Sequence, residues 1–278
     1  MLQPRLASTS DTPALDAQVL LANILGHQRA WVLAHPDARL SPGKARALEH
    51  AITRLEDGEP LPYVLGRWEF FGLSFIVTPA VLIPRPETEL LVEQALAWLQ
   101  AHPECRRAAD VGTGSGCIAV SLTVNVPGVQ FIATDISRPA LAVARQNAAA
   151  HGVTERIGFI QADLLSACRR ASIPFDLICA NLPYIPSQTL VNLRVARWEP
   201  GPALDGGPDG LELVRRLLIQ AAARVAPGGL LLAEIEATQG AFALALGRTV
   251  FPGADVRVLP DLAGRERLLR IQTDPSNI

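Results

Sequence analysis

The sequence is poor in lysine, in sulfur-containing residues and in aromatic residues. Only one of its 25 basic residues, Lys44, is a lysine; it has four cysteines and one methionine, and 5% of its residues are aromatic. The formal net charge is −2 at pH 7, whereas a protein that covers a nucleic-acid backbone needs a sustained basic surface. The composition therefore argues against a protein whose main task is to coat nucleic acid.

Metal-binding and membrane-spanning patterns are also missing. Zinc sites need closely spaced ligands. In this sequence no cysteine belongs to a C-x-x-C pair, and the five histidines do not cluster near the cysteines. The most apolar stretch, residues 217–233, is interrupted by Arg224 and by a Pro-Gly-Gly turn, so it is too short to span a membrane. Because no charged-then-apolar leader opens the sequence, we expect a cytoplasmic protein with free thiols and no metal.

The 278 residues, 49% of them hydrophobic, suffice for one large domain and a small one. Capping residues followed by proline predict helices over residues 13–26 and 42–58. Proline, glycine, aromatic and β-branched residues over 60–84 predict a hairpin between two domains. The expected regions are an N-terminal helical domain over 1–65, a β-hairpin linker over 66–84 and a larger domain over 85–278.

Helical and strand patterns alternate through the larger domain. A helical pattern from residue 87 precedes a strand that ends at Val111. Further strands are expected at 129–134, 157–160, 175–180 and 229–235, and near 255–258 and 267–272, with helices from about Gly116 and over 139–151 and 208–226. This alternation is typical of a doubly wound parallel α/β sheet.

The turn after the first of these strands, residues 110–116, reads D-V-G-T-G-S-G. Its three glycines permit positive φ and let the backbone approach a ligand at the N-terminus of the next helix. The third glycine follows the second by two residues, not by three as in the dinucleotide fingerprint, and Asp110 suits a cationic ligand. The alternative is an ordinary tight turn. The residues expected to bind the cofactor are Asp110, Gly112, Thr113, Gly114, Ser115 and Gly116.

Two further carboxylates end successive strands. Asp135 is placed to accept hydrogen bonds from ribose hydroxyls. Asp163 is placed to accept one from an adenine amine, with Leu164 beside the base. Either carboxylate alone is equally compatible with a helix cap or a turn, but the carboxyl edge of an open α/β sheet is where ligands bind. The order of the three acidic residues along the chain therefore favours a nucleoside-containing cofactor.

The motif Asn181-Leu182-Pro183-Tyr184 follows the fourth strand. It resembles the N-P-P-Y motif of amino-methyltransferases that use S-adenosylmethionine, and nearly the whole chain resembles the release-factor glutamine methyltransferases known as PrmC or HemK. The other matching segments are E-P-L-P-Y-V-L-G (59–66), I-P-R-P-E-T-E (83–89), the glycine-rich turn, T-D-I-S (134–137), W-E-P-x-x-A-L-x-G-G-x-D-G-L (198–211) and D-L-A-G-R-E-R (261–267). The segment 83–89 separates it from the ribosomal-protein glutamine methyltransferases.

The resemblance implies a Rossmann-like class I methyltransferase fold and a defined reaction. S-adenosylmethionine would donate a methyl group to the side-chain nitrogen (N5) of the glutamine in the Gly-Gly-Gln motif of class I release factors, leaving S-adenosylhomocysteine. The N-terminal helical domain would help to hold the release factor. Asn181 would contact cofactor and substrate, and Glu87 either positions a ligand or is a plain first-turn carboxylate. We expect a monomer that does not bind nucleic acid directly.

The chemistry of the motif can be stated physically. A glutamine amide nitrogen is a poor nucleophile because its lone pair is delocalised into the carbonyl. If the Asn181 side-chain oxygen and the Leu182 carbonyl oxygen each accept an amide N–H, the nitrogen gains electron density and is aimed at the methyl group, while Tyr184 flanks the amide and Pro183 keeps residue 182 extended. Positioning, rather than a strong base, would dominate.

The sequence departs from the family pattern at Leu182, where proline is usual, and at Glu236, where glycine is common. Leucine also has a backbone carbonyl, so we expect activity to survive with a looser loop; Glu236 has no evident role in the sequence.

Three alternatives remain at this point. An N-methyltransferase acting on an exocyclic amine of a nucleic-acid base would use a similar motif. It would need a basic groove, however, and Arg106-Arg107, Arg169-Arg170 and Arg215-Arg216 are isolated pairs. A nicotinamide-dependent dehydrogenase is disfavoured by the glycine spacing. A silent binding module would keep affinity for the methyl donor without transfer.

Overall fold

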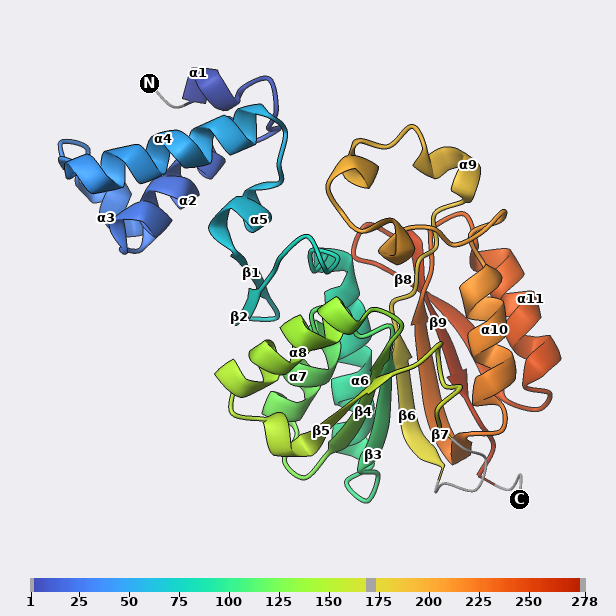
Figure 1. The fold of residues 1–278 in the computed structure, drawn as a ribbon. Coiled ribbons are helices and arrows are strands. Elements are labelled where there is room, and N and C mark those ends of the chain that lie inside the picture. The colour runs from blue at the N-terminus through green and yellow to red at the C-terminus, as the bar shows by residue number, and fades with distance from the viewer. Residues whose placement is uncertain (1–2, 169–173, 276–278) are drawn as a thin grey trace. The chain divides into compact units, whose positions relative to one another are not determined.

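The computed structural model describes residues 3–168 and 174–275, so the pair Arg169-Arg170 lies outside the described residues. The chain divides into two compact units, Met1–Trp68 and Glu69–Ile278. Each unit has its own hydrophobic core, and we describe each by itself (Figure 1).

The N-terminal unit is helical. Its helices are α1 (Gln3–Leu6), α2 (Pro13–Leu25), α3 (Arg29–Ala34), α4 (Pro42–Glu56) and α5 (Leu61–Leu65). Gly26 ends α2 in the left-handed conformation (φ 74°), and the Ser41 hydroxyl accepts a hydrogen bond from the backbone N–H of Lys44 at the start of α4. The ammonium group of Lys44 donates to the carbonyl of Leu25 at the end of α2 (2.7 Å). The two predicted helices are confirmed, whereas α5 was not expected.

A β-hairpin follows, formed by β1 (Arg67–Phe70) and β2 (Leu73–Ile76). Phe71 and Gly72 have φ of 50° and 69°, the positive values of a two-residue hairpin turn that matches strand twist. Glu89 accepts a hydrogen bond from Phe71 N (2.8 Å), and Asn147 accepts one from Ile76 N (2.7 Å). These bonds attach the hairpin to the helices that follow it in the chain.

The C-terminal unit is built on a sheet of seven strands within the described residues, in the order β5-β4-β3-β6-β7-β9-β8. They are β3 (Arg107–Val111), β4 (Gln130–Asp135), β5 (Ile157–Gln161), β6 (Phe175–Ala180), β7 (Val225–Glu234), β8 (Asp255–Pro260) and β9 (Glu266–Gln272). The expected doubly wound α/β fold is confirmed. Strands β3 to β7 pair in parallel, whereas β9 is antiparallel to both β7 and β8. The short turn from β8 to β9 leaves no room for a crossover, so these two strands must be antiparallel.

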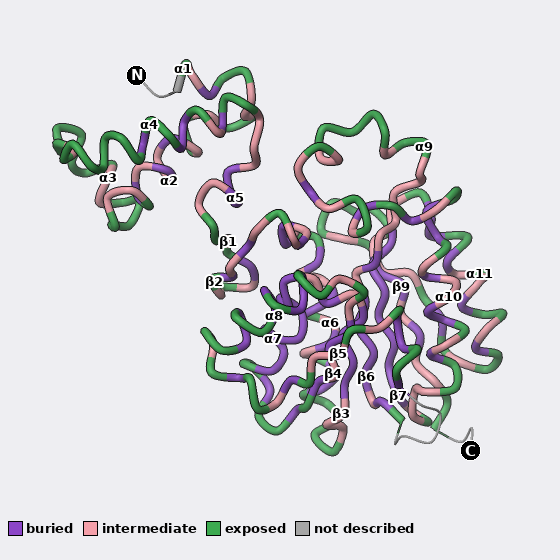
Figure 2. The backbone as a smooth tube through the Cα atoms, in the orientation of Figure 1, coloured by how far each residue is buried: buried purple, intermediate pink, exposed green. Residues whose placement is uncertain are grey.

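Helices cover both faces of this sheet (Figure 1). On one face lie α6 (Glu89–Ala101), α7 (Cys117–Asn125) and α8 (Arg138–Ala150), and on the other α10 (Glu212–Ala221) and α11 (Gly240–Val250). Along β6, Leu177 and Cys179 belong to the first core whereas Ile178 and Ala180 belong to the second, as the alternation of a strand requires. Figure 2 shows the buried strands between more exposed helices.

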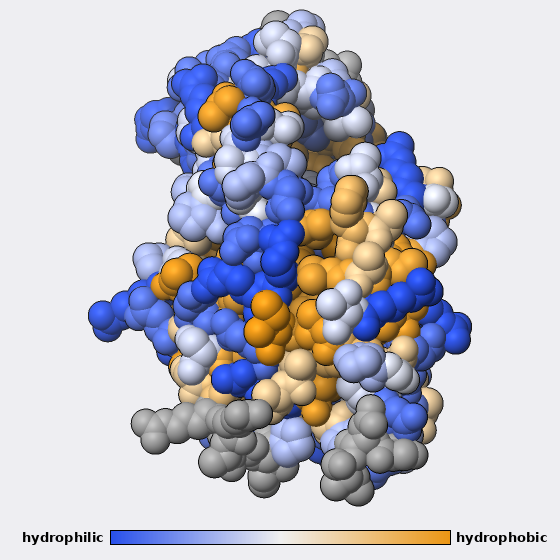
Figure 3. All heavy atoms as spheres, turned by 90° about the vertical axis from the view of Figure 1, so that its right-hand side faces the viewer, coloured by the Kyte–Doolittle hydropathy of each residue, from blue (hydrophilic) through white to orange (hydrophobic). Residues whose placement is uncertain are grey.

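Helix α11 was not expected from the sequence. A Cβ atom at its Gly247 would lie 2.8 Å from Val256 on β8, so glycine is needed there for close packing of helix on sheet. On the outer side, Ile219 of α10 and Phe242 of α11 are exposed, and Figure 3 shows hydrophobic surface on this side of the molecule. Every helix among the described residues is too short or too polar to cross a membrane.

Candidate active site

A cavity of about 310 Å³ opens where the parallel strands end. Its wall is formed by the turn after β3, by the segments that follow β4, β5 and β6, by residues between 80 and 88, and by residues between 200 and 203. Most of this lining is apolar side chains and backbone. The size and composition suit a small organic ligand, and the carboxyl edge of the sheet is the expected place for one.

The glycine-rich turn has the predicted backbone shape. Gly112, Gly114 and Gly116 have φ of 73°, 54° and 80°. The backbone N–H groups of Gly112 and Thr113 both donate to the carbonyl of Thr134 on β4 (2.9 Å each), and a Cβ atom at Gly116 would lie 3.1 Å from that of Ala144 on α8. Gly112, Thr113, Gly114 and Ser115 line the cavity, whereas Gly116 is not among the lining residues.

Asp110 lies beneath the turn rather than on the cavity wall. It is fully buried, and its Oδ2 accepts hydrogen bonds from the Thr113 hydroxyl (2.7 Å) and from the backbone N–H of Ala119 (3.2 Å). Its Oδ1 has no hydrogen-bond partner within the described residues. Burial raises the pKa of Asp110 to about 6. Asp110 therefore caps the first turn of α7, and its contact with a cationic ligand stays a prediction.

Asp135 lines the cavity at the end of β4. Its two oxygens accept one backbone N–H each, from Gly114 (2.9 Å) and from Ser137 (2.8 Å), so the side chain joins the glycine-rich turn to the start of α8. Burial raises its pKa. Since a carboxylate has about four lone-pair sites, Asp135 retains acceptors for a ligand.

Asp163 and Leu164 also line the cavity. Asp163 is exposed and forms an ion pair with Arg216 of α10, which is itself a lining residue. Leu164 is buried and has a φ of 53°, a left-handed conformation that costs a non-glycine residue about 1–3 kcal/mol and is concentrated at functional sites.

The motif after β6 places two hydrogen-bond acceptors at the cavity. Asn181 and Leu182 both line it, and neither Asn181 Oδ1 nor the Leu182 carbonyl accepts a hydrogen bond from any residue that the structure describes. The Leu182 side chain is buried, and its Cδ2 would lie 2.9 Å from a Cβ atom at Gly112. The leucine that replaces the family's proline therefore packs directly on the glycine-rich turn.

The two remaining motif residues differ in position. Pro183 lines the cavity, whereas Tyr184 is not among the lining residues. The Tyr184 carbonyl accepts a hydrogen bond from Gln239 (3.0 Å). Burial first, and then the nearby Glu234 carboxyl, raise the pKa of the Tyr184 hydroxyl.

Four polar residues around the cavity were not identified from the sequence as site residues. Arg85 of the cavity wall forms an ion pair with the buried Glu199, which also accepts a hydrogen bond from Ile83 N (3.1 Å). Thr88 of η1 (Pro86–Thr88) lines the cavity and donates to the buried Glu234 at the end of β7 (2.7 Å). The only sequence signal for Arg85, Thr88 and Glu199 was their place in the segments 83–89 and 198–211, and that for Glu234 was its place near the end of the expected strand 229–235.

The structure also shows the surroundings of Glu236 and Glu87, whose roles the sequence left open. Glu236 accepts hydrogen bonds from the backbone N–H (2.8 Å) and the hydroxyl of Thr238, and its own N–H donates to Gln239 (3.0 Å). It therefore shapes the turn that leads into α11 and holds Gln239 against the motif. Glu87 is exposed in η1 and is not among the residues that line the cavity.

Two of the three arginine pairs, 106–107 and 215–216, lie within residues 3–168 and 174–275. Arg215 pairs with Asp209 and Glu212 at the surface, and Arg216 pairs with Asp163. Arg106 donates to the adjacent carbonyl of Cys105. No group of three or more potential metal ligands occurs in residues 3–168 and 174–275.

Comparison with known proteins gives consistent results. The family model of the PrmC N-terminal domain matches residues 2–66, and that of the methyltransferase small domain matches residues 87–197. The release factor glutamine methyltransferase of Moorella thermoacetica is 45% identical over 92% of this chain and 90% of its own. That of Chlorobaculum tepidum is 40% identical over 90% of this chain and 87% of its own.

Solved structures support the fold. The N-terminal domain of human METTL16 in complex with SAH aligns with a TM-score of 0.52 at 18% identity, over 85% of this chain and 84% of that one. At this level of identity, the similarity concerns the fold alone.

Proposed function

The chain belongs to the family of release factor glutamine methyltransferases, and on that premise we propose that it methylates the Gly-Gly-Gln glutamine of class I peptide chain release factors at N5. The observation that carries this proposal is a pair of acceptors, Asn181 Oδ1 and the Leu182 carbonyl, that have no hydrogen-bond partner among the described residues and lie at one cavity beside the glycine-rich turn. Two acceptors match the two N–H bonds of a primary amide.

S-adenosylmethionine fits the cavity by size and by the groups that the chain presents. The groups that would hold it are the backbone of the glycine-rich turn and the residues Asp135, Asp163, Leu164 and Asn181. Asp110 Oδ1, which has no hydrogen-bond partner in the described part of the chain, would supply negative charge beneath the turn. When bound, this cofactor supplies a methyl group on a positively charged sulfur, and the S–CH₃ bonding pair stays on sulfur when the new N–CH₃ bond forms.

The protein's contribution is orientation. Asn181 Oδ1 and the Leu182 carbonyl would each accept one N–H of the substrate amide, which fixes its plane and raises electron density on nitrogen. Pro183 holds the backbone of residue 182 extended, and Tyr184 would support the same loop from behind. The surplus proton on the methylated nitrogen passes to water, so no strong base is required of the chain.

Mass spectrometry of an intact class I release factor after incubation with the protein and S-adenosylmethionine tests the proposal. We expect one added methyl group, located by fragmentation on the Gly-Gly-Gln glutamine. A release factor without that glutamine, changed to alanine, is the matched control. Methylation of RNA or DNA in parallel reactions, with none on the release factor, would instead support the nucleic-acid alternative.

The cofactor assignment has a separate test. Replacing Asp135 by alanine removes both the ribose acceptor and the bonds to Gly114 and Ser137, so we expect S-adenosylhomocysteine to bind about 10- to 100-fold more weakly in calorimetry. Asp135→Asn keeps an oxygen acceptor, so its affinity for S-adenosylhomocysteine should fall by less than that of Asp135→Ala. Unchanged affinity in Asp135→Ala would place the ribose elsewhere.

A further inference from the structure

Three residues from distant parts of the chain form one hydrogen-bonded series beside the cavity. Asn181 Nδ2 donates to the Thr88 hydroxyl (2.9 Å), and the Thr88 hydroxyl donates to Glu234 Oε2 (2.7 Å). Thr88 and Glu234 are each 1% exposed, so water does not replace these bonds. We call this series the Asn181–Thr88–Glu234 relay.

We propose that Thr88 and Glu234 are positioning residues that determine which atom of the Asn181 amide faces the cavity. This inference rests on the proposed function, in which the substrate amide donates to Asn181 Oδ1. The oxygen and nitrogen of an asparagine amide have nearly the same size and shape. Packing therefore cannot choose between the two orientations, and hydrogen-bond partners must do so.

The relay makes that choice by donor and acceptor chemistry. An ionised carboxylate only accepts hydrogen bonds, and a hydroxyl has one proton. The Thr88 hydroxyl therefore donates its one hydrogen bond to Glu234, and it can only accept a hydrogen bond from Asn181. Because the amide NH₂ is the donor on Asn181, it turns to Thr88 and Oδ1 turns to the cavity. The opposite orientation would present an NH₂ group to the substrate's own NH₂.

The relay has a second state when Glu234 is protonated. A protonated carboxyl can donate to Thr88, which frees the Thr88 proton for Asn181 Oδ1 and reverses the amide. Burial raises the pKa of Glu234 to about 7, with Thr88, Arg267 and Tyr184 acting in the opposite direction and Glu87 reinforcing the rise. Cys117 of α7 is a further titratable neighbour, with its own pKa raised by burial to about 12. Transfer should therefore decline as the pH falls below about 7.

The matched variants Thr88→Val and Thr88→Ser test the inference. Valine keeps the shape but loses the hydroxyl, whereas serine keeps the hydroxyl. We expect Thr88→Val to lose at least about tenfold in kcat with the release factor, with affinity for S-adenosylhomocysteine within about twofold of wild type, and Thr88→Ser to stay close to wild type. Equal kcat in wild type and Thr88→Val, or equal losses in both variants, would overturn the inference.

A readout that needs no substrate separates this inference from the proposed function. Hydrogen exchange of the Asn181 side-chain amide is followed by NMR, with its signals assigned by their absence in Asn181→Asp. We expect slow exchange in wild type and Thr88→Ser and fast exchange in Thr88→Val. If wild type leaves release factors unmethylated, the proposed function fails, and equal exchange in wild type and Thr88→Val would overturn the relay independently.

A further variant covers the case in which Thr88→Val does not fold. Glu234→Gln cannot change its protonation, so we expect its rate to lose the decline below about pH 7 that wild type has. Retention of the wild-type pH profile in Glu234→Gln would overturn the inference.

Discussion

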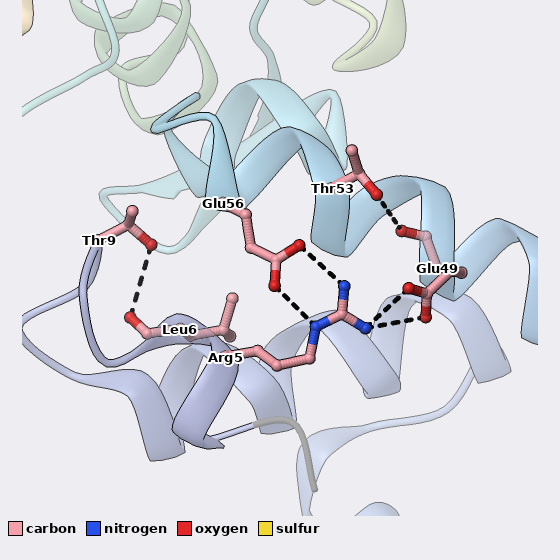
Figure 4. A network of polar contacts seen from close by, with 6 residues as sticks. All are labelled: Arg5, Leu6, Thr9, Glu49, Thr53 and Glu56. Carbon is pink, nitrogen blue, oxygen red and sulfur yellow. Dashed lines mark hydrogen bonds and ion pairs between the residues drawn. The ribbon is translucent and has the colours of Figure 1, made fainter.

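Each unit contains a three-residue polar network that joins segments far apart in the sequence. In the N-terminal unit, Arg5 donates to Glu49 (2.7 Å) and to Glu56 (2.7 and 2.8 Å), as Figure 4 shows. Their side chains are 35%, 61% and 37% exposed. In the C-terminal unit, two members of the Asn181–Thr88–Glu234 relay, Thr88 and Glu234, are almost fully buried.

The difference in exposure decides what each network can do. Water replaces the partners of an exposed ion pair at little cost, so such a pair contributes little to stability. A buried hydroxyl or carboxyl that loses its partner keeps an unsatisfied group. The Arg5 network is therefore tolerant of change, whereas the relay imposes one arrangement on the residue at its end.

The largest expected effect is at Asn181, the end of the relay that lines the cavity. Asn181→Ala removes the side-chain oxygen that we propose as the acceptor for the substrate amide. We expect methyl transfer to fall by about 100- to 1,000-fold while affinity for S-adenosylhomocysteine changes little, because the side chain is proposed to contact mainly the substrate. Single-turnover assays and calorimetry measure the two quantities. Transfer at nearly the wild-type rate would contradict the role of the side chain.

The next effect is on the stability of the protein and concerns Glu234, the buried end of the relay. Because the pKa of Glu234 is raised from 4.5 to about 7, the folded protein binds more protons than the unfolded chain between these values. The free energy of unfolding therefore falls as the pH rises through this window, by up to about 3 kcal/mol. Glu234→Gln removes this cost, so we expect its Tm relative to wild type to increase from about pH 5 to about pH 8.

The pKa of the Asp110 carboxyl is also raised. Asp110 is present in both wild type and Glu234→Gln, so it does not affect the difference in Tm between them. An equal Tm difference at both pH values would show that Glu234 is ionised in the folded protein at both, so that its pKa is not raised.

A smaller effect on rate is expected at Leu182. Its carbonyl, not its side chain, is proposed to contact the substrate, so Leu182→Pro should change kcat by less than about threefold. The buried side chain packs on Gly112, so the variant should lose stability. Leu182→Ala removes more of this side chain, should lose about 2–5 kcal/mol, and serves as the control that lacks the restraint of proline. A large gain in rate would show that leucine handicaps the site.

The smallest effect is expected in the exposed network. Arg5→Gln should change Tm only slightly, and the change should shrink further in high salt because exposed charges are screened. The Glu56 pKa is lowered by its bond to Arg5, so the small contribution is present above the ordinary pKa of Glu56 and lost as the pH falls. A large, salt-independent loss of Tm would remove the contrast between the two networks.

Local patterns predicted much of the fold and of the cavity wall. Short-range geometry determines the alternation of strands and helices, the glycines of the turn and the acidic residues at strand ends. Strands β3 to β7 accordingly lie close to the ranges expected from the sequence. Antiparallel β9 and helix α11 were less predictable. The direction of β9 depends on the turn at Asp261, and α11 depends on Gly247 packing against β8.

The sequence by itself determined the family, the glycine-rich turn and the motif that begins at Asn181, because each is a contiguous run with its own local geometry. Only the tertiary structure decided that Thr88, Glu234 and Asn181 meet, since 93 residues separate the first and last of these and 146 separate the first two. It also decided that Asp110 lies beneath the cavity rather than on its wall. Hydrogen bonds between distant segments depend on how strands are ordered in the sheet, and no local pattern encodes that order.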